Sequence, residues 1–567
     1  MVNGIFAEKD ADKQSRKPCA TLEDKTNDEH DQRGYLKGEP APMAQAKTIA
    51  QLLKTADGQD CPGIIDFPNS LRDLPVSTVI HDNRQVTDGS LFFAIEGYAS
   101  DGHTYARDAL RSGAAAIIAQ KPIPDIEGAD APVIMVEDSR IALACAAASF
   151  YDHPSAALNI SGVTGTNGKT TAIYLLDAIA RAAGEQSGVI GTVESKYSLP
   201  ADPHTGLSEE CAHNTATTTP DALQLQILFA EMRDAGVQSV AMEVSSHAID
   251  MHRVEQTAFA AVAFTNLSQD HLDYHNTMEE YQRVKERLFY DFDTGARIIN
   301  VDDAVGADLA RRLRAEGTEV VCVGLQKQLQ GQSQAEGPGL ALDFTATDLV
   351  QGSHITDFIL ATPTESVPVS FPLVGTYNVE NALVAAACAY ARGISLETIA
   401  RGLSSAAQVP GRLEQIEEGQ NFKVFVDYAH TPDALATALA AVREQTTGRV
   451  IAVFGCGGDR DPLKRPLMGA AACKVSDHVI VTSDNPRSED PAKIVADVLE
   501  GLDSTQAKCD AVVDRREAIF HAISIAQEGD SILVAGKGHE DYQIFADRTI
   551  HFDDREVARA GLESIKG

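Results

Sequence analysis

A glycine-rich loop is the feature of this sequence with the clearest chemical meaning. The run SGVTGTNGKTT occupies residues 161–171, between a strand-like run at 158–160 and a helix-like run at 172–183. In this setting backbone N–H groups face a phosphate, a lysine neutralises it and a threonine hydroxyl can hold Mg²⁺. The longer form of the loop has glycine where Val163 stands, so the pattern here is the shorter G-x-x-G-K-T. It predicts an ATP site formed by Gly165, Thr166, Asn167, Gly168, Lys169, Thr170 and Thr171.

Further polar side chains gather where predicted strands end, which is where open α/β sheets bind their ligands. Glu243 ends one such strand and could take a hard cation that bridges phosphates, although an ordinary buried, paired carboxylate would give the same pattern. Residues 265–275 hold two histidines, two aspartates and an asparagine, a density unusual for a structural loop. A solvated polar loop is the alternative. Lys285, in the next predicted helix, reads by itself as a surface lysine paired with a neighbour.

The last third of the chain carries another set of candidate residues. Asn378 and Asn381 are three apart, and therefore on one face, in a predicted alanine-rich helix. Asp427 and His430 follow the end of a predicted strand. The glycine-rich run at 455–461 resembles a nucleotide loop but lacks its lysine.

Two loops at 484–487 and 536–540 complete this ring of strand ends. Arg487 lies in the first of them. A planar guanidinium suits a bidentate grip on a carboxylate, so Arg487 indicates an amino-acid substrate.

The elements that must position these loops alternate between strand and helix. A chain of 567 residues suggests roughly three to four domains of ~150 residues. The alternation predicts mostly parallel sheets covered on both faces, with a second α/β unit starting after Gly411. A small α/β unit is expected before the loop, with a helix at 44–53, and 326–353 is expected to be an irregular excursion. The other predicted elements are strands at 77–79, 91–95, 114–119, 239–244, 260–265, 296–301, 424–426, 450–454, 478–482 and 531–535, and helices at 221–235 and 278–289.

Composition and charge narrow the classes of function. No apolar run approaches the ~18 residues of a membrane span, and residues 1–12 are acidic where a signal peptide needs a basic start. The nine cysteines contain no C-x-x-C pair, which favours reduced thiols in a cytosol over disulfides or thiolate metal sites. A net charge of −34 argues against a nucleic-acid partner. We therefore expect a cytoplasmic protein with no membrane or nucleic-acid partner. Its phosphate sites must then rely on local basic residues, for which the candidates are Lys169, Arg253, Arg412, Arg460 and Arg487.

The order and spacing of these motifs resemble those of the Mur ligases of peptidoglycan synthesis. The resemblance covers about residue 76 to the end and rests on 165–170, 243–247, 270–273, 378–381, 411–412 and 427–430. It implies an α/β, three-domain architecture, with residues 1–60 left as a polar, disordered extension. The implied domains are a UDP-sugar-binding domain at 61–154, a central P-loop ATPase domain with a mostly parallel sheet at 155–408, and a Rossmann-like, amino-acid-binding C-terminal domain at 409–567.

The loops at 484–487 and 536–540 look like those of the family branch that adds meso-2,6-diaminopimelate. The resemblance implies transfer of the ATP γ-phosphoryl group to the D-glutamyl γ-carboxylate of UDP-N-acetylmuramoyl-L-alanyl-D-glutamate. The amine of diaminopimelate then attacks the acyl phosphate. Phosphate departs, and an amide bond is formed. Lys169 and Mg²⁺ would spread the charge on the transferred group. The resemblance also suggests a monomer.

Position by position, the resemblance assigns the residues around the nucleotide. Thr170 and Glu243 would hold one Mg²⁺, and His271 and Lys285 a second. Lys285 would be carbamylated and thus carboxylate-like, which replaces the surface-lysine interpretation. The implied catalytic residues are Lys169, Glu243, His271 and Lys285. Closure of the last domain would complete the ATP side with Asn378, Asn381, Arg412, Asp427 and His430.

The resemblance also assigns residues to the UDP substrate and to diaminopimelate. Asn83 stands where a serine is common, and Met251 where a glutamine can occur, so the uridine end departs from the family pattern. Arg487 would grip the distal carboxylate of diaminopimelate, and Glu540 its distal ammonium. The residues implied for the UDP substrate are Asn83, Thr218, Thr219, Ser245 and Arg253, with the turn at 98–100. Those implied for diaminopimelate are Arg460, Asp484, Asn485, Pro486, Arg487, Gly536 and Glu540.

Three other functions stay open at this point. A ligase for L-lysine is disfavoured by Arg487, because lysine has no distal carboxylate and a buried, unpaired guanidinium is costly. A folylpolyglutamate-type ligase would share the ATPase core, but the first domain and the loop at 484–487 argue against it. A P-loop ATPase acting as a switch would hydrolyse ATP whether or not a muropeptide and an amino acid were present.

Overall fold

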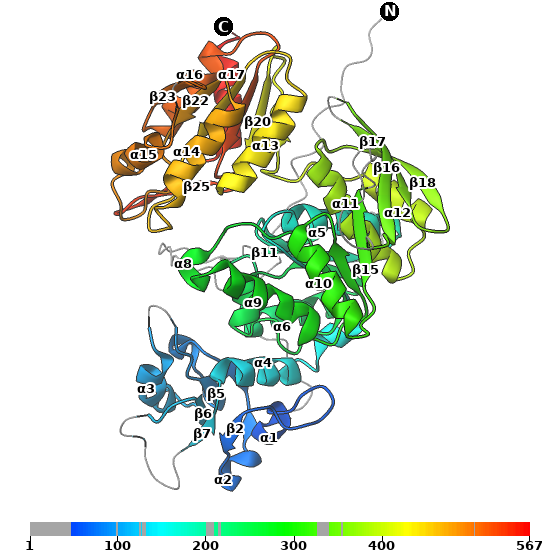
Figure 1. Cartoon of the computed structure of the whole chain (residues 1–567). Helices are drawn as coiled ribbons and strands as arrows, with labels where there is room; N and C mark the ends of the chain where they lie inside the picture. Colours follow the sequence, from blue (N-terminus) through cyan, green and yellow to red (C-terminus); the bar gives the residue numbers. More distant parts are fainter. Residues whose placement is uncertain are drawn as a thin grey trace, which may run out of the picture. The chain divides into compact units, whose positions relative to one another are not determined.

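The computed structural model describes residues 47–97, 100–123, 126, 132–199, 209–213, 217–325, 340–352, 355–503 and 505–566, with only the backbone described at Asp273. The chain divides into two compact units. The first lies within 1–164, 184–262 and 284–296, and the second within 165–183, 263–283 and 297–567. Figure 1 labels the elements along the chain.

The amino-terminal part of the first unit is built on a five-stranded sheet. Its elements are β1 (Lys47–Thr48), α1 (Ile49–Leu52), β2 (Ile64–Asp66), α2 (Asn69–Arg72), β3 (Pro75–Val76), β4 (Thr78–Ile80), η1 (Asn83–Gln85), β5 (Ser90–Phe93), η2 (Gly102–Tyr105), α3 (Ala106–Arg111), β6 (Ala116–Ala119), β7 (Val133–Val136), α4 (Ser139–Phe150) and η3 (Pro154–Ala157). The strand order is β2-β7-β6-β5-β4, and β4 to β7 run parallel. Residues 44–46 of the helix predicted at 44–53 lie outside the described residues, and α1 begins at Ile49, where Thr48 forms a capping box.

The rest of the first unit contains the strand that leads into the glycine-rich loop. Its elements are β8 (Asn159–Thr164), β9 (Ser187–Ile190), β10 (Ser195–Ser198), β11 (Glu210–His213), α6 (Ala222–Asp234), β12 (Ser239–Glu243) and α7 (Ser246–Asp250). β12 lies between β8 and β9 and is parallel to both. Asp221 caps α6 by accepting a hydrogen bond from Gln224 N. The parallel strands end together, so Glu243 at the end of β12 lies beside the end of β8.

Two elements, β13 (Phe259–Phe264) and α9 (Met278–Tyr290), run from one unit into the other. The central elements of the second unit are α5 (Lys169–Ala182), α8 (Leu272–His275), β14 (Arg297–Asn300), α10 (Ala304–Ala315), β15 (Val321–Leu325), β16 (Phe344–Gln351), β17 (Thr356–Ala361), β18 (Ser366–Phe371), α11 (Thr376–Ala391) and α12 (Leu396–Ser404). β14, β15 and β16 are parallel, and β16, β17 and β18 form an antiparallel meander. α5 packs against α11 and α12.

The expectation of an irregular excursion at 326–353 is wrong over β16. Phe344 and Ala346 alternate into the core, and the strand pairs with β15 on one side and β17 on the other. The pairing supplies partners for the backbone, so a segment of modest strand propensity still forms a strand. Residues 326–339 and 353 of that expectation lie outside the described residues.

The carboxyl-terminal part of the second unit is a six-stranded sheet with helices on both faces. The strand order is β19-β20-β24-β21-β22-β23, and β20 to β24 are parallel to their neighbours. The elements are β19 (Glu414–Gln415), β20 (Lys423–Asp427), α13 (Pro432–Glu444), β21 (Val450–Phe454), α14 (Lys464–Val475), β22 (His478–Val481), α15 (Pro491–Leu499), β23 (Lys508–Ala511), α16 (Arg515–Ile525), β24 (Ser531–Ala535), β25 (Tyr542–Ile544), β26 (Thr549–His551) and α17 (Asp554–Ser564).

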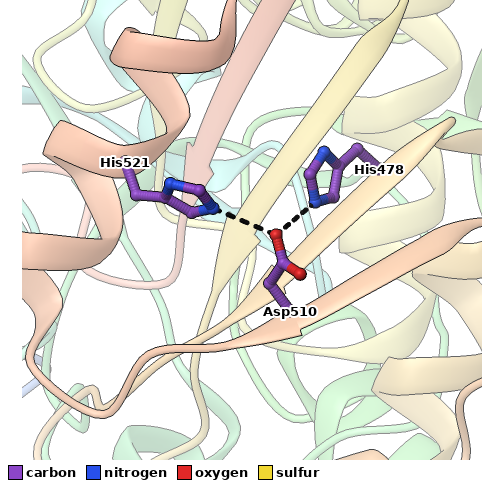
Figure 2. Close-up of side chains that lie close together, drawn as sticks. All are labelled: His478, Asp510 and His521. Carbon is purple, nitrogen blue, oxygen red and sulfur yellow. Dashed lines mark hydrogen bonds and ion pairs between the residues drawn. The ribbon is translucent and has the colours of Figure 1, made fainter.

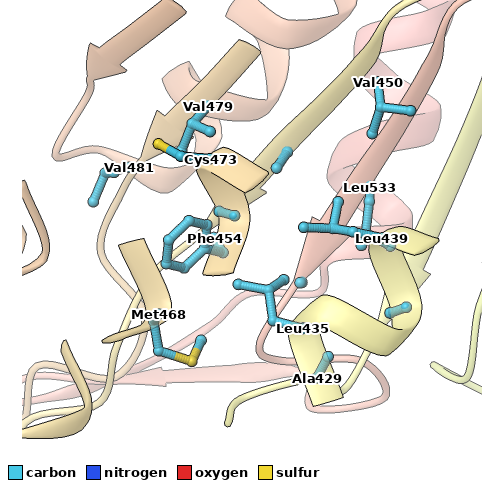
Figure 3. Packing of buried hydrophobic residues seen from close by; sticks show 14 of the residues in the cluster. Ala429, Leu435, Leu439, Val450, Phe454, Met468, Cys473, Val479, Val481 and Leu533 are labelled. Atoms are coloured by element: carbon cyan, nitrogen blue, oxygen red, sulfur yellow. The ribbon is translucent and has the colours of Figure 1, made fainter. Parts of the chain in front are cut away.

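Two hydrophobic layers hold this last sheet in place. Leu435 and Leu439 of α13 and Met468 of α14 pack on Phe454 and Leu533, as Figure 3 shows. The opposite face is covered by α16 and α17. Parallel strands buried on both faces read as continuous apolar runs, which is why the sequence predicts them closely. Among the described residues, no helix is both long and apolar enough to cross a lipid bilayer.

Candidate functional site

The glycine-rich loop adopts a backbone that favours glycine at its turning points. Gly165 and Gly168 have positive φ angles of 146° and 85°. A Cβ at Gly168 would lie 2.1 Å from Asn381 Oδ1, so the start of α11 is packed directly against the loop. Lys169 begins α5, and its Nζ donates hydrogen bonds to the carbonyl oxygens of Gly165 and Thr166 at 2.9 and 2.8 Å. The lysine thus closes the loop on itself, at the end of the helix where an anion is favoured.

The loop is held by the polar segment that follows β13. Asn266 Oδ1 accepts a hydrogen bond from Asn167 N at 2.9 Å, and the Asn266 carbonyl accepts one from Thr166 N at 2.8 Å. Thr265 Oγ1 donates to the Asn167 carbonyl at 2.6 Å. Thr166 Oγ1 lies 3.2 Å from Tyr281 OH on α9. The solvated-loop alternative is therefore wrong for residues 265–266, because their polar groups bind the glycine-rich loop.

Arg412 connects the last part of the second unit to the same loop. Its Nη2 donates a hydrogen bond to Thr170 Oγ1 at 2.8 Å, and its guanidinium lies 4.6 Å from the centre of the Tyr428 ring. Its Nε is buried and has no hydrogen-bond partner among the described residues. Arg412 therefore places a fixed positive charge beside the first turn of α5.

Two other residues predicted on the ATP side, Asn378 and Asp427, form hydrogen bonds with backbone groups. Asn378 donates from Nδ2 to the Val374 carbonyl at 2.8 Å. Asp427 caps the turn after β20, accepting from Leu413 N and Ala429 N at 2.7 and 2.8 Å. Burial raises the pKa of Asp427 despite the charge of Arg412.

Asp270 and His430 form an electrostatic link across the second unit. Burial raises the pKa of Asp270, but the positive charges of His271, His430 and Lys464 outweigh it and hold the pKa below the usual value. Burial lowers the pKa of His430, although the negative charge of Asp270 acts in the opposite direction. His271 has a left-handed backbone, with φ of 54°, and its Nε2 lies 3.4 Å from Asp270 Oδ2.

The four residues predicted to bind metal ions belong to two different units. Thr170 and His271 belong to the second unit, whereas Glu243 and Lys285 belong to the first. Glu243 is 1% exposed and accepts hydrogen bonds from Thr192 N at 2.9 Å and Thr192 Oγ1 at 3.2 Å. Lys285 is also 1% exposed, which excludes the surface-lysine interpretation. The joint metal site of these residues stays a prediction.

Four residues predicted for the UDP substrate meet in the first unit. Thr219 Oγ1 donates to the Glu243 carbonyl at 2.9 Å and accepts from Ser245 N at 3.1 Å. Arg253 Nη1 donates to the Thr219 carbonyl at 2.9 Å. Thr192 Oγ1, which donates to Glu243 Oε2, lies 3.1 Å from Thr218 Oγ1 and so joins this group to Glu243.

The remaining residues predicted for the UDP substrate, Asn83 and the turn at 98–100, come from the amino-terminal part of the first unit. Asn83 starts the short helix η1, which Asp82 caps by accepting from Arg84 N at 3.1 Å. Of the turn predicted at 98–100, residues 98–99 lie outside the described residues.

A buried charged cluster brings together the two loops predicted to bind diaminopimelate. Asn485 Nδ2 donates to Glu540 Oε2 at 2.9 Å. Lys537, whose side chain is fully buried, donates from Nζ to Asn485 Oδ1 at 3.2 Å and to Glu540 Oε2 at 3.3 Å. Its Nζ lies 3.6 Å from Asp484 Oδ1. Two carboxylates, one amide and one ammonium thus share one enclosed space.

Burial raises the pKa of Glu540, although the charge of Lys537 pulls it down. Asp484 Oδ1 is buried and accepts no hydrogen bond from the described residues. Asp484 and Glu540 share the single positive charge of Lys537. One negative charge is therefore left, which a further positive group can balance. The cluster is therefore suited to binding an ammonium group.

Arg487 lies at the edge of this cluster in a conformation that fixes its direction. It has φ of 52°, and its N–H donates to the Ile544 carbonyl at 3.0 Å. Its Nη1 donates to the Gly458 carbonyl at 2.9 Å. Pro486 is buried, Arg460 is exposed, and Gly536 has φ of 119° at the end of β24.

Sequence reasoning did not assign roles to Thr192, Asn266, Tyr281 and Lys537. Thr192 follows β9, a short strand that was not predicted, and its position after a parallel strand is the signal that could have found it. Lys537 sits between two glycines in a recognised motif, but only the fold reveals its complete burial.

Three regions of the chain match models of one known protein family. Residues 163–389 match the Mur ligase middle domain, residues 411–538 the Mur ligase glutamate ligase domain, and residues 75–151 the Mur ligase family catalytic domain. The predicted family and the α/β, three-domain fold class are thereby confirmed.

Individual relatives cover most of the chain. It is 45% identical over 491 residues to a UDP-N-acetylmuramoyl-L-alanyl-D-glutamate--2,6-diaminopimelate ligase of Geobacillus kaustophilus, covering 85% of this chain and 94% of that protein. A ligase of the same name from Bacillus cereus is 42% identical over 505 residues, covering 88% and 96%. A solved structure of a ligase of this name is 31% identical, with a TM-score of 0.60 and coverage of 89% and 98%. The chain therefore belongs to the Mur ligase family.

Proposed function

We propose that this chain is an ATP-dependent, ADP-forming ligase that joins meso-2,6-diaminopimelate to UDP-N-acetylmuramoyl-L-alanyl-D-glutamate. The observation that carries the proposal is the buried cluster of Asp484, Asn485, Lys537 and Glu540 beside Arg487. The excess negative charge of the cluster suits the ammonium group at one end of an amino acid. The Arg487 guanidinium suits a carboxylate of the same amino acid. Relatives at 45% and 42% identity carry the name of a ligase for this substrate.

ATP would bind the loop at 165–171, with its phosphates against the N-terminus of α5. Lys169 and Arg412 would place two positive charges beside the transferred phosphoryl group. Asn378, Asn381, Asp427 and His430 would line the nucleotide from the other side.

Mg²⁺ fits the donors that the chain offers, because the Thr170 hydroxyl and the buried Glu243 carboxylate are hard oxygen ligands. Bound there, it would neutralise charge on the phosphates. We propose His271 and Lys285 for a second ion, with Lys285 carbamylated. A buried ammonium would repel a cation, whereas a carbamate offers it two oxygens.

The reaction would start when the D-glutamyl γ-carboxylate attacks the γ-phosphorus of ATP, forming an acyl phosphate and ADP. The free amine of diaminopimelate then attacks the acyl carbon, the C–O bond to phosphate breaks, and the amine loses its proton. The protein's main contribution would be to hold amine and acyl carbon in line and to exclude water, which competes for the same intermediate.

Selection of diaminopimelate over lysine would rest on Arg487. The two amino acids differ by one distal carboxylate, and without it the half-buried guanidinium lacks a negatively charged partner. A site built to bind a charged group rejects an analogue that lacks it by a large factor.

The muropeptide would be held by Asn83, Thr218, Thr219, Ser245 and Arg253. We propose domain boundaries of 61–154, 155–408 and 409–567, with 1–60 as an extension. A monomer acting in the cytoplasm on soluble precursors, with no membrane or nucleic-acid partner, fits this reaction.

An isotope experiment tests the proposal. With ¹⁸O in the γ-carboxylate of the D-glutamyl residue, the acyl-phosphate route transfers one ¹⁸O atom to the released phosphate for each amide formed. Mass spectrometry of the phosphate and of the tripeptide measures both. Phosphate without ¹⁸O would refute the acyl phosphate, and phosphate release that needs neither muropeptide nor amino acid would favour an ATPase switch.

A further inference from the structure

Two histidines and an aspartate converge on one point of the carboxyl-terminal sheet, outside the proposed ligase site (Figure 2). His478 Nε2 lies 2.7 Å from Asp510 Oδ2, and His521 Nε2 lies 3.0 Å from the same oxygen. The three atoms that could bind a metal all lie within 4.8 Å of one another. Among the described residues, no other group of at least three histidine, cysteine, aspartate or glutamate side chains meets this criterion.

Three different elements supply the cluster, which fixes it in place. His478 begins β22, Asp510 lies on the paired strand β23, and His521 lies on α16. The loop at 484–487 follows the opposite end of β22. At about 3.3 Å per strand residue, the cluster is on the order of 20 Å along the chain from Asp484.

The donor set suits a transition metal better than Mg²⁺. Two imidazole nitrogens and one carboxylate oxygen are typical ligands of Zn²⁺ and its first-row neighbours, whereas Mg²⁺ prefers oxygen. Bond lengths of about 2.0–2.2 Å in a tetrahedral site separate ligand atoms by about 3.3 Å. The N–O distances of 2.7 and 3.0 Å need to widen by only a few tenths of an ångström.

Exposure leaves room for the ion and for a water ligand. His478 is buried, but the side chains of Asp510 and His521 are 27% and 34% exposed. Lys508 Nζ lies 3.5 Å from Asp510 Oδ2, and its side chain, 66% exposed, can turn into solvent. Its ammonium competes with a cation for the same carboxylate.

We propose that His478, Asp510 and His521 bind a divalent first-row transition metal such as Zn²⁺, which ties α16 to β22 and β23. Each imidazole binds through Nε2, so the Nε2 proton exchanges with solvent and the ring takes the Nδ1–H form. Water fills the fourth position. The ion is structural and takes no part in the ligase reaction.

The test is a Co²⁺ titration of untagged, full-length protein, followed by visible absorption. Tetrahedral Co²⁺ absorbs far more strongly than octahedral Co²⁺, so ions at the Mg²⁺ positions contribute little. We expect a tetrahedral spectrum that His521→Ala removes and Zn²⁺ abolishes, but excess Mg²⁺ does not. The matched control is His551→Ala, because His551 is an exposed histidine that also binds a carboxylate, that of Glu556.

Lys508→Ala separates a metal site from a simple hydrogen-bond network. Loss of the competing ammonium should tighten Co²⁺ binding, and Zn²⁺ should raise the melting temperature of the wild type and of Lys508→Ala but not of His521→Ala. Ligase turnover should be unchanged in both variants. The proposal is overturned if the wild type gives no tetrahedral spectrum, or if His521→Ala retains it.

Discussion

Arg515 and Asp554 form an ion pair in which neither side chain has any exposed surface. Two hydrogen bonds of 2.7 Å join Arg515 Nε and Nη2 to the two oxygens of Asp554. The remaining donors of Arg515 reach the Ser483 and Ala535 carbonyls at 3.2 and 2.9 Å. Ala535 is the last residue of β24 and precedes Gly536. Ser483 follows β22 and precedes Asp484. The pair therefore holds the two loops of the proposed amino-acid site at a fixed distance.

Replacing Asp554 with asparagine should destabilise the protein strongly. The guanidinium would remain buried without its counter-charge, a situation that costs about 3–5 kcal/mol. Urea unfolding measured at the carboxyl-terminal domain checks this value. Asp547→Asn, which breaks the exposed pair with Arg548, is the matched control and should change little. Equal effects of the two substitutions would contradict the structural role of Arg515.

Gly168→Ala should lower ATP-dependent turnover by about a hundredfold, through a clash that adds to the backbone strain of the positive φ. The new Cβ would meet Asn381 Oδ1 at 2.1 Å and displace the phosphate loop from α11. A displacement of this order costs about a hundredfold in rate. Gly184→Ala is the control, because Gly184 has a similar φ of 79° but no neighbour within 4 Å. Steady-state kinetics of both variants decide the matter, and similar losses would point to strain alone.

Lys285 should carry CO₂ if it serves as a metal ligand. We expect a carbamate signal in ¹³C NMR after addition of ¹³C-labelled bicarbonate, and its loss, together with all ligase activity, in Lys285→Ala. Lys196→Ala provides the control, because Lys196 is also poorly exposed but forms ion pairs with Glu194 and Glu210. Full turnover by Lys285→Ala would refute the second metal position.

Lys537→Met should weaken diaminopimelate binding and shift its pH dependence. Burial already raises the pKa of Glu540, so the carboxylate form that binds an ammonium increases as pH rises through that pKa. Without the Lys537 charge the pKa rises further, and the rise in kcat/KM for diaminopimelate should move to higher pH.

Lys423→Met is the matched control, because Lys423 belongs to the same sheet and its Nζ donates hydrogen bonds to Gln445 rather than to a carboxylate. It should leave the pH profile of kcat/KM in place. An unchanged profile in Lys537→Met would show that Glu540 does not bind the substrate ammonium.

The sequence predicts much of the sheet framework because buried parallel strands are continuous apolar runs. β21 and β24 coincide with the predicted strands, and Glu243 does end its strand. By contrast, β16 was missed because its stability comes from pairing with β15 and β17 rather than from its own composition.

The candidate site was predictable where chemistry is local in sequence, as in the loop around Lys169. Contacts made across long separations were not. Thr192 meets Glu243 from 51 residues away, and Arg412 meets Thr170 from 242 residues away. Only the folded chain brings such pairs together, and a single sequence does not display those contacts.

ATP-dependent phosphate release tests the central claim most directly. Purified protein is given UDP-N-acetylmuramoyl-L-alanyl-D-glutamate with either meso-diaminopimelate or L-lysine, and phosphate and product are measured together. We predict release only with diaminopimelate, matched by equal amounts of the tripeptide product. Equal or faster release with lysine would contradict the role of Arg487, and release without either amino acid would contradict the ligase itself.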